Sequence, residues 1–188
     1  MKKGVLITIA VIVAIVFIVG SSLAGTYNRL AKMEESVNSQ WAQVENVIKR
    51  RADLIPNLVN TVKGYASHEE EVLTKITNAR AGFESARTPE EYAEANAQFE
   101  SAMRSLNVVV ENYPDLKANQ NFLELQAELA GTENRISTER MRYNDAVREF
   151  NTAIRRFPTN IIARLFGFEQ KAYFQIDAED MEVPEVNF

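Results

Sequence analysis

The sequence WAQVENVIKRRADLIPNLVNTV, residues 41–62, decides the fold. One side of this stretch repeats at alternating steps of three and four residues, and the repeat extends in both directions. Ten of its twelve positions are apolar or aromatic. A period of about 3.5 residues is typical of a helix that packs against other helices in a coiled coil. We therefore predict one long helix over residues 26–65, and we call the twelve positions the seam: Tyr27, Leu30, Glu34, Val37, Trp41, Val44, Ile48, Arg51, Ile55, Leu58, Val62 and Tyr65.

An apolar segment precedes the seam. Residues 5–19 carry no charge, and residues 20–24 add only the small hydroxyls of Ser21 and Ser22. As a helix, these 20 residues can cross about 30 Å of hydrocarbon. The alternative is a cleaved signal peptide, because Lys2 and Lys3 form a basic start. We favour a retained transmembrane anchor over residues 1–25, because the apolar run is long for an export signal.

Charge and residue size predict how the anchor is placed in the membrane. Lys2 and Lys3 favour a cytoplasmic N-terminus with the rest of the chain outside the cell (inner) membrane, although Arg29 and Lys32 follow the span closely. Small residues three or four apart let helices approach closely. One such face is therefore a candidate for transmembrane packing, with ordinary lipid contact as the alternative: Ala10, Ala14, Ser21 and Ala24.

The rest of the chain contains few helix breakers and no alternating strand pattern, which predicts an all-α fold. We expect residues 26–157 to form an elongated antiparallel bundle of four long helices with coiled-coil packing, over about 26–65, 67–87, 89–112 and 115–157. Ser67 with Glu70, and Thr88 with Glu91, have the spacing of capping boxes at helix starts. The last helix carries one heptad position of large apolar residues: Phe122, Leu129, Ile136, Tyr143, Phe150 and Phe157.

The C-terminal segment, residues 158–188, is rich in aromatic residues. Pro158 is expected to break the preceding helix, and Thr159 can cap a short helix over residues 160–166. We favour aromatic side chains that fold back and close the end of the bundle, because large exposed apolar patches are rare on isolated domains. The alternative is an exposed docking patch. The residues concerned are Phe157, Phe166, Phe168, Tyr173, Phe174 and Phe188.

The composition excludes several functions. Residues 26–188 contain 19 basic and 26 acidic residues, a formal charge of −7, which argues against nucleic acid or anionic lipid as the main partner of this part. The absence of cysteine excludes thiol catalysis and disulfides. His68 precedes three glutamates but has no second histidine, so helix capping is favoured over metal binding. With no nucleophile motif or glycine-rich phosphate loop, the sequence assigns no catalytic residue, cofactor or metal.

The most unusual segment, residues 49–58, places three cations just before Pro56. Proline removes a backbone hydrogen bond, so the helix is expected to bend there. Arg51 lies on the seam and should meet a carboxylate, such as Glu133 or Glu139, or a partner subunit. We favour a role in fixing helix register, with a recognition site for a ligand or neighbour as the alternative. The candidate residues are Arg50, Arg51, Asp53, Pro56 and Asn57.

Residues 26–188 resemble the LemA family of bacterial membrane proteins. The motifs that carry the resemblance are YNRL (27–30), WAQV (41–44), RRADLIPNLV (50–59), VKGY (62–65), HE (68–69), TNARA (77–81), FPTN (157–160), FGF (166–168) and YF (173–174). The resemblance implies a single-pass N-terminal anchor, a bundle of long helices and no established enzymatic activity. Similar proteins have also been proposed with the short N-terminus outside, opposite to the orientation that the charges favour.

Three functions are compatible with these features. The leading hypothesis is a non-enzymatic, membrane-anchored helical scaffold that forms homo-oligomers and presents an interaction surface to an unidentified membrane or envelope protein, with residues 5–24 in the lipid bilayer. The alternative is a sensor or regulatory subunit of a membrane complex, with a ligand or partner bound between Lys49 and Asn57. A hydrolase whose site is assembled across helices is the least favoured.

Overall fold

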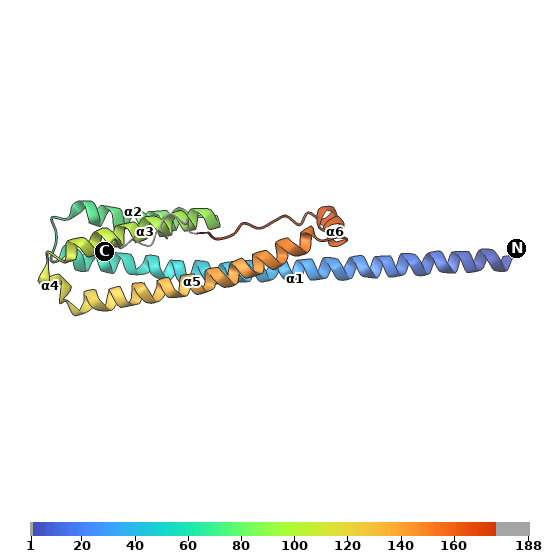
Figure 1. Ribbon diagram of the computed structural model, residues 1–188, viewed down its shortest axis with the longest axis horizontal. Helices are drawn as coiled ribbons and strands as arrows, with labels where there is room; N and C mark the ends of the chain where they lie inside the picture. The colour runs from blue at the N-terminus through green and yellow to red at the C-terminus, as the bar shows by residue number, and fades with distance from the viewer. Residues whose placement is uncertain (1, 176–188) are drawn as a thin grey trace, which may run out of the picture. The chain divides into compact units, whose positions relative to one another are not determined.

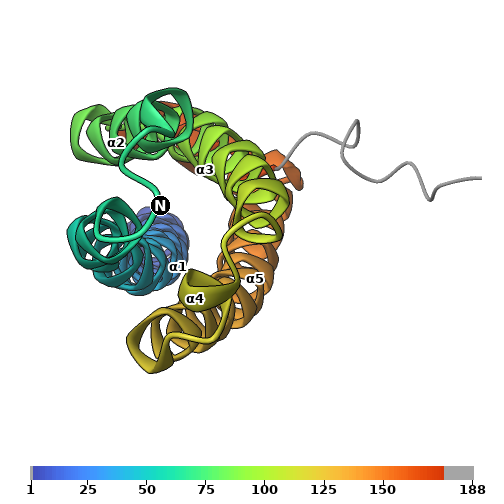
Figure 2. The same cartoon turned by 90° about the vertical axis from the view of Figure 1, so that its left-hand side faces the viewer.

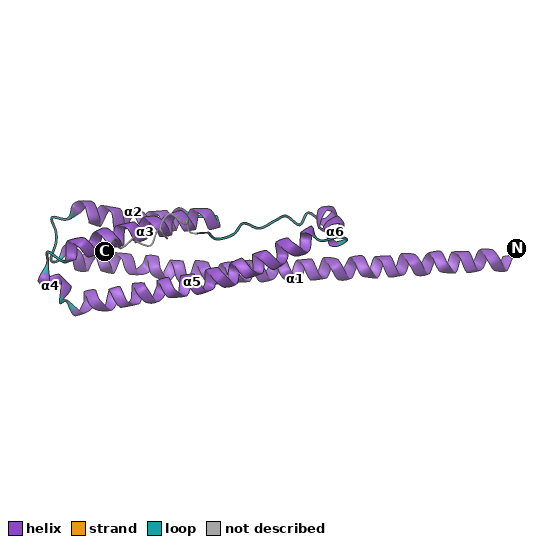
Figure 3. Cartoon of the chain, viewed as in Figure 1, coloured by secondary structure: helices purple, strands orange, loops and turns teal. Residues whose placement is uncertain are grey.

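A computed structural model describes residues 2–175, and this part of the chain contains six helices and no strand (Figures 1 and 3). The all-α prediction is therefore confirmed. Residues 176–188, which include Phe188 of the aromatic set, lie outside the described residues. The helices are α1 (Lys2–Lys63), α2 (Glu70–Ser85), α3 (Pro89–Val110), α4 (Pro114–Lys117), α5 (Gln120–Arg155) and α6 (Thr159–Phe166).

The chain divides into two compact units. Unit 1 contains Met1–Gln40 and Asp145–Lys171, and unit 2 contains Trp41–Asn144 and Ala172–Phe188. The helices α1 and α5 each contribute to both units, since the boundary at residues 40/41 falls inside α1 and the one at residues 144/145 falls inside α5.

Unit 2 has a core formed by α2, α3, α4, the last part of α1 and the first part of α5. Its seam positions Val44, Ile48, Ile55, Leu58 and Val62 are at most 1% exposed. Each large apolar side chain that is fully buried contributes about 1.5–3 kcal/mol to stability. The helices α2 and α3 pack side by side (Figure 2). The helices α2, α3 and α5 cover the seam with their own buried side chains. These include Ile76, Phe83, Phe99, Leu106, Phe122, Leu129 and Ile136.

Unit 1 combines the first part of α1, the end of α5 and α6. Its core is small, because α1 contributes only Leu30 and Val37 as buried residues. The end of α5 and α6 supply the rest: Val147, Phe150, Ile154, Ile162 and Ala163. Tyr27 packs against two aromatic rings, with centroids 4.9 Å away at Phe166 and 5.7 Å away at Phe168.

The N-terminal part of α1 is apolar and uncovered. Large apolar side chains between Leu6 and Val19 are 51–75% exposed. This helix is long and apolar enough to cross a membrane, and none of its most apolar window is buried. It continues as a helix through Gly25 and into the seam.

Two helix starts differ in how well the sequence predicts them. The capping box of α3 is confirmed, because Thr88 Oγ1 accepts a hydrogen bond from the Glu91 N–H, and the Glu91 carboxylate accepts one from the Thr88 N–H. The capping box at Ser67 does not form. Residues 64–69 make turns instead, with the Glu69 N–H bonded to the Ala66 carbonyl, and α2 begins only at Glu70.

Further helix boundaries differ from the predicted ranges. The single helix expected over residues 115–157 is divided into α4 and α5, because the Asn119 side chain accepts the Phe122 N–H at 3.0 Å and starts a new helix. Thr159 is the first residue of α6 rather than its cap. The residue that follows the end of α6, Gly167, adopts the left-handed conformation with φ 76°. Glycine adopts this backbone at low cost.

Candidate functional site

Arg51 is buried in unit 2, where it joins three helices. Its side chain is 3% exposed and forms ion pairs with Glu100 of α3 and Glu133 of α5. Its Nη1 also donates a 2.6 Å hydrogen bond to Oδ1 of Asn96 in α3. The guanidinium carbon lies 4.5 Å from the centre of the Phe99 ring. The predicted pairing with Glu133 is confirmed, and we call these five residues the Arg51 network.

The partners in the Arg51 network compensate the buried charge of Arg51. A buried cation is stable only when it is paired and hydrogen-bonded, and two carboxylates and an amide do this for Arg51. The Nε–H of Arg51 is buried without a hydrogen-bond partner in residues 2–175. Glu100 and Glu133 are both bound to one cation, so neither is placed as a free base. Glu139, the other predicted partner, bonds Arg142 instead.

The other candidates of residues 49–58 lie outside the network. Arg50 pairs with Glu128 at 2.8 Å on the surface, where the two side chains are 57% and 42% exposed. Asp53 and Asn57 are exposed. Pro56 is half-buried inside α1, which continues to Lys63. Of the candidates in this segment, Arg51 is therefore the one that belongs to the network.

A cavity of about 410 Å³ lies beside the same segment in unit 2. Lys49 and Asp53 of α1 line it, together with Glu84 of α2 and Tyr92 of α3. The ring of Tyr92 also packs edge-on against Trp41, with centroids 5.5 Å apart. The described residues contain no group of three or more His, Cys, Asp and Glu that could hold a metal ion.

The end of the described chain is fixed in unit 2 by side chains of α5. Phe174 is fully buried and packs edge-on against Trp41, with centroids 5.8 Å apart. Asn144 accepts the Phe174 N–H at 2.9 Å and donates to the Phe174 carbonyl at 3.0 Å. The Tyr143 hydroxyl donates to the Ala172 carbonyl at 2.8 Å. This part of the aromatic segment is closed onto the helices, as the favoured interpretation expected.

A second asparagine makes the same arrangement in unit 1. Asn151 donates to the Lys171 carbonyl at 2.8 Å and accepts the Lys171 N–H at 2.9 Å. The Lys171 ammonium forms an ion pair of 2.6 Å with Glu34, a charged seam position of α1. The Phe168 ring packs against Phe150, with centroids 6.3 Å apart.

The remaining predicted aromatic residues are exposed to different degrees. Phe157 is 80% exposed, Phe166 is 52% exposed although one side contacts Tyr27, and Tyr173 is 38% exposed. Neither interpretation therefore describes the whole set. Phe168 and Phe174 pack inside their units, whereas Phe157 and part of Phe166 face outward.

Sequence reasoning missed four polar residues that hold these contacts: Asn96, Glu100, Asn144 and Asn151. Asn96 and Asn151 are 1% and 7% exposed. A detectable signal was present, because each is a polar residue close to an aromatic heptad position. Asn144 and Asn151 are also seven residues apart, the spacing of one face of a helix.

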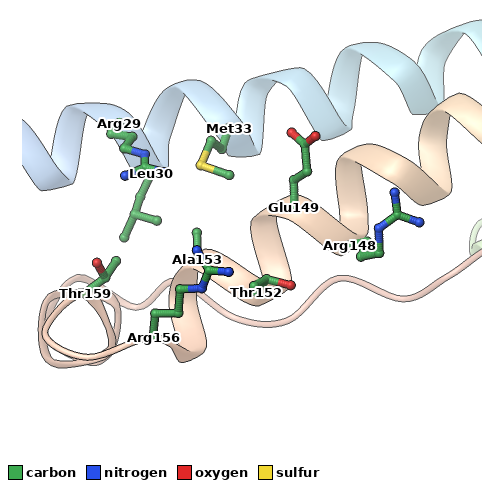
Figure 4. Close-up of a pocket in the computed structure, with 9 residues that line it drawn as sticks. All are labelled: Arg29, Leu30, Met33, Arg148, Glu149, Thr152, Ala153, Arg156 and Thr159. Atoms are coloured by element: carbon green, nitrogen blue, oxygen red, sulfur yellow. The ribbon is translucent and has the colours of Figure 1, made fainter.

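Unit 1 has a cavity of about 330 Å³ with a basic lining (Figure 4). Arg29 of α1, Arg148 and Glu149 of α5, and Arg156 just after α5 line it, and Thr159 borders it at the start of α6. Arg148 forms an ion pair of 2.8 Å with Asp145. The cavity therefore has three cations and one carboxylate among its lining residues.

The four candidate packing residues of the anchor are exposed. Ala10, Ala14, Ser21 and Ala24 are not buried by any other part of residues 2–175. The Ser21 hydroxyl donates to the Phe17 carbonyl at 2.8 Å, so its polar group is satisfied within α1. This face is available for contact in the membrane without a polar cost.

Comparison with known proteins identifies relatives. A model of the LemA family matches residues 40–188. Protein LemA of Metamycoplasma hominis is 28% identical over 166 residues, which cover 86% of this chain and 76% of the relative. Magnetosome protein MamQ 2 of Paramagnetospirillum magneticum is 26% identical over 196 residues, which cover 90% of this chain and 71% of the relative. Magnetosome protein MamQ of Magnetospirillum gryphiswaldense is 23% identical over 195 residues, with the same two shares.

Replacing Arg51 tests the network. We expect Arg51→Leu to lower the free energy of unfolding by about 3 kcal/mol, the low end for a broken buried ion pair, because Glu100 and Glu133 can rehydrate. The matched change Arg50→Leu should cost less than about 1 kcal/mol, since its ion pair is exposed. Urea unfolding of the detergent-solubilised protein measures both. Equal losses in the two variants would show that the Arg51 network does not stabilise unit 2.

The raised pKa of Tyr143 predicts a loss of stability at high pH. Burial, with a smaller contribution from the Glu90 carboxylate, raises the pKa of Tyr143 from 10 to about 12. The folded protein keeps this proton where the unfolded chain has lost it, so the contribution is full below pH 10 and is lost as the pH rises to about 12. Tyr143→Phe should cost about 0.5–1.5 kcal/mol below this range for the lost hydrogen bond and flatten the decline within it. Identical slopes of unfolding free energy against pH for the unchanged protein and for Tyr143→Phe would contradict this prediction.

Proposed function

Because the chain belongs to the LemA family, we propose that it is a non-enzymatic membrane-anchored helical scaffold. In this proposal the protein forms homo-oligomers and presents a surface to another membrane or envelope protein. It crosses the cell membrane once, with the N-terminus inside and the helical domain outside. Lys2 and Lys3 support this orientation.

One observation carries the proposal. The apolar part of α1 is uncovered by the rest of the described chain, while the same helix continues into a seam whose positions Leu30 and Val37 are at most 2% exposed. Large exposed apolar surfaces mark contact with a membrane or a partner. A transmembrane helix that continues directly into a packed helix of the domain favours a protein that holds other molecules at the membrane. It is less expected of a domain that is only tethered by an anchor.

The face formed by Ala10, Ala14, Ser21 and Ala24 supports self-association. Helices in membranes associate mainly through close packing, for which small residues are suited. The larger side chains Ile12 and Val19, on the opposite side of the helix, are 54% and 51% exposed and can face lipid. We propose that the small-residue face is the contact between copies inside the bilayer.

The relatives support a role in assembly. Two of those compared are named as magnetosome proteins, and none of the relatives' names states a reaction. The Arg51 network also supports this role, since both of its carboxylates are occupied by a cation. We propose that the partner is another protein of the same membrane or envelope.

A sensor or regulatory subunit is the second candidate. The cavity of about 410 Å³ in unit 2 favours it, because the cavity lies beside residues 49–57 and is lined by both Lys49 and Asp53. A ligand with both charges, or a segment of a partner, fits that lining. Protection of this segment by an added ligand, seen in hydrogen–deuterium exchange, would favour the sensor over the scaffold.

The size of detergent-solubilised complexes tests the scaffold. We expect the full-length protein to be oligomeric at micromolar concentration by light scattering, and protein lacking residues 1–25 to form smaller complexes. Ala14→Leu should reduce the oligomer, because the larger side chain separates the helices, whereas the matched change Val19→Leu on the opposite side of the helix should not. A monomeric full-length protein would contradict the proposal.

A further inference from the structure

The short helix α6 exposes apolar side chains that the described chain does not cover. It packs into unit 1 through Ile162 and Ala163, which are 5% and 2% exposed. Ile161 and Leu165 lie one turn apart on another side and are 58% and 71% exposed. Together with the exposed rings of Phe157 and Phe166, these two side chains form a surface that we call the α6 patch.

Cations surround the α6 patch. Residues 150–168 contain three arginines and no acidic residue, although the chain as a whole carries a formal charge of −5. Arg155, Arg156 and Arg164 are exposed. None of the three forms an ion pair with any residue from 2 to 175. The net acidic charge that argued against anionic lipid therefore does not describe this part of the surface.

The position of α6 in unit 1 is set by the end of the apolar span. Phe166 lies 4.9 Å from the ring of Tyr27, measured between centroids. Tyr27 follows Ala24, the last residue of the apolar segment, by three residues, which is about 4.5 Å along a helix. A span in a bilayer therefore places α6 at the height of the lipid headgroups, where tyrosine is also favoured.

We propose that the α6 patch lies in the headgroup region of an anionic lipid bilayer. The apolar side chains enter the boundary between headgroups and acyl chains, and the guanidinium groups of Arg155, Arg156 and Arg164 bind lipid phosphates. This inference rests on the proposed function only in requiring that residues 5–24 span the bilayer. It adds a second membrane contact that orients unit 1 on the surface.

Charge favours a bilayer over a second copy of this chain as the occupant. A symmetric contact between two α6 patches would bring the three arginines of one copy towards those of the other, which is unfavourable. An anionic bilayer offers both an apolar interior and phosphate oxygens. It is also already present at this height, because the span of the same unit ends there.

The absence of cysteine allows single spin labels to test the proposal in the full-length protein. Leu165→Cys labels the patch, and Val108→Cys on α3 is a matched control because both side chains are 71% exposed. Val13→Cys labels the span. The three proteins are placed in vesicles of phosphatidylcholine with phosphatidylglycerol, and collision rates with oxygen and with a water-soluble nickel chelate report depth. We expect the ratio of oxygen to nickel collisions at position 165 to exceed that at 108 severalfold and to remain below that at 13.

A second variant separates the role of charge. Replacing Arg155, Arg156 and Arg164 by Gln should lower the ratio at position 165 in anionic vesicles and leave the ratios at 13 and 108 unchanged. An aqueous label at 165 beside a membrane-embedded label at 13 would overturn the inference while leaving the anchor intact. An aqueous label at 13 would instead overturn the proposed function. A label at 165 shielded from both oxygen and nickel would show that protein, from a second copy or from elsewhere in the chain, covers the patch and would also overturn the inference.

Discussion

The apolar seam of α1 must be kept out of water, and both compact units are built on this constraint. In unit 2 the seam side chains from Val44 to Val62 are covered by α2, α3 and the first part of α5. In unit 1 the end of α5 and α6 cover Leu30 and Val37. Helix propensity alone stabilises long helices only weakly, and burial of one apolar side supplies most of the stability. The same helix has no such cover over residues 6–24, and that difference separates the anchor from the folded domain.

Arg51 is a charged residue at a position of the otherwise mostly apolar seam. The free-energy cost of burying this charge explains the polar residues around it. A charge at a seam position must be paired and hydrogen-bonded, and the side chains that do so come from α3 and α5. Arg51 meets these partners only when the three helices are in one register, because ion pairs and hydrogen bonds need specific geometry whereas apolar contacts do not. We propose that the network thereby adds specificity to the core of unit 2, whose other buried members among the described residues, apart from Thr132, are apolar.

Local sequence signals predicted the structure correctly at positions where one interaction dominates. The Thr88 cap and the pairing of Arg51 with Glu133 follow from a short spacing and from the cost of a buried charge. The capping box at Ser67 failed because the chain turns over residues 64–69 and α2 begins only at Glu70, so Ser67 does not directly precede the first turn of the helix. Glu100 and the asparagine contacts to Lys171 and Phe174 could not be predicted, since they depend on which segments distant in sequence meet. The net charge likewise averages over a basic region near α6 and does not describe that part of the surface.

The proposed scaffold depends on the apolar span continuing into the seam as one helix, and this continuity also sets the height of α6 at the membrane. Spin labels at Val13→Cys and Asn38→Cys measure this directly, because both positions are exposed in unit 1. A continuous helix places the two backbone positions about 37 Å apart at 1.5 Å per residue. Electron–electron resonance on protein in vesicles should therefore give one narrow distance distribution near that value. A broad distribution at shorter distances would show a flexible joint between anchor and domain and would contradict this account.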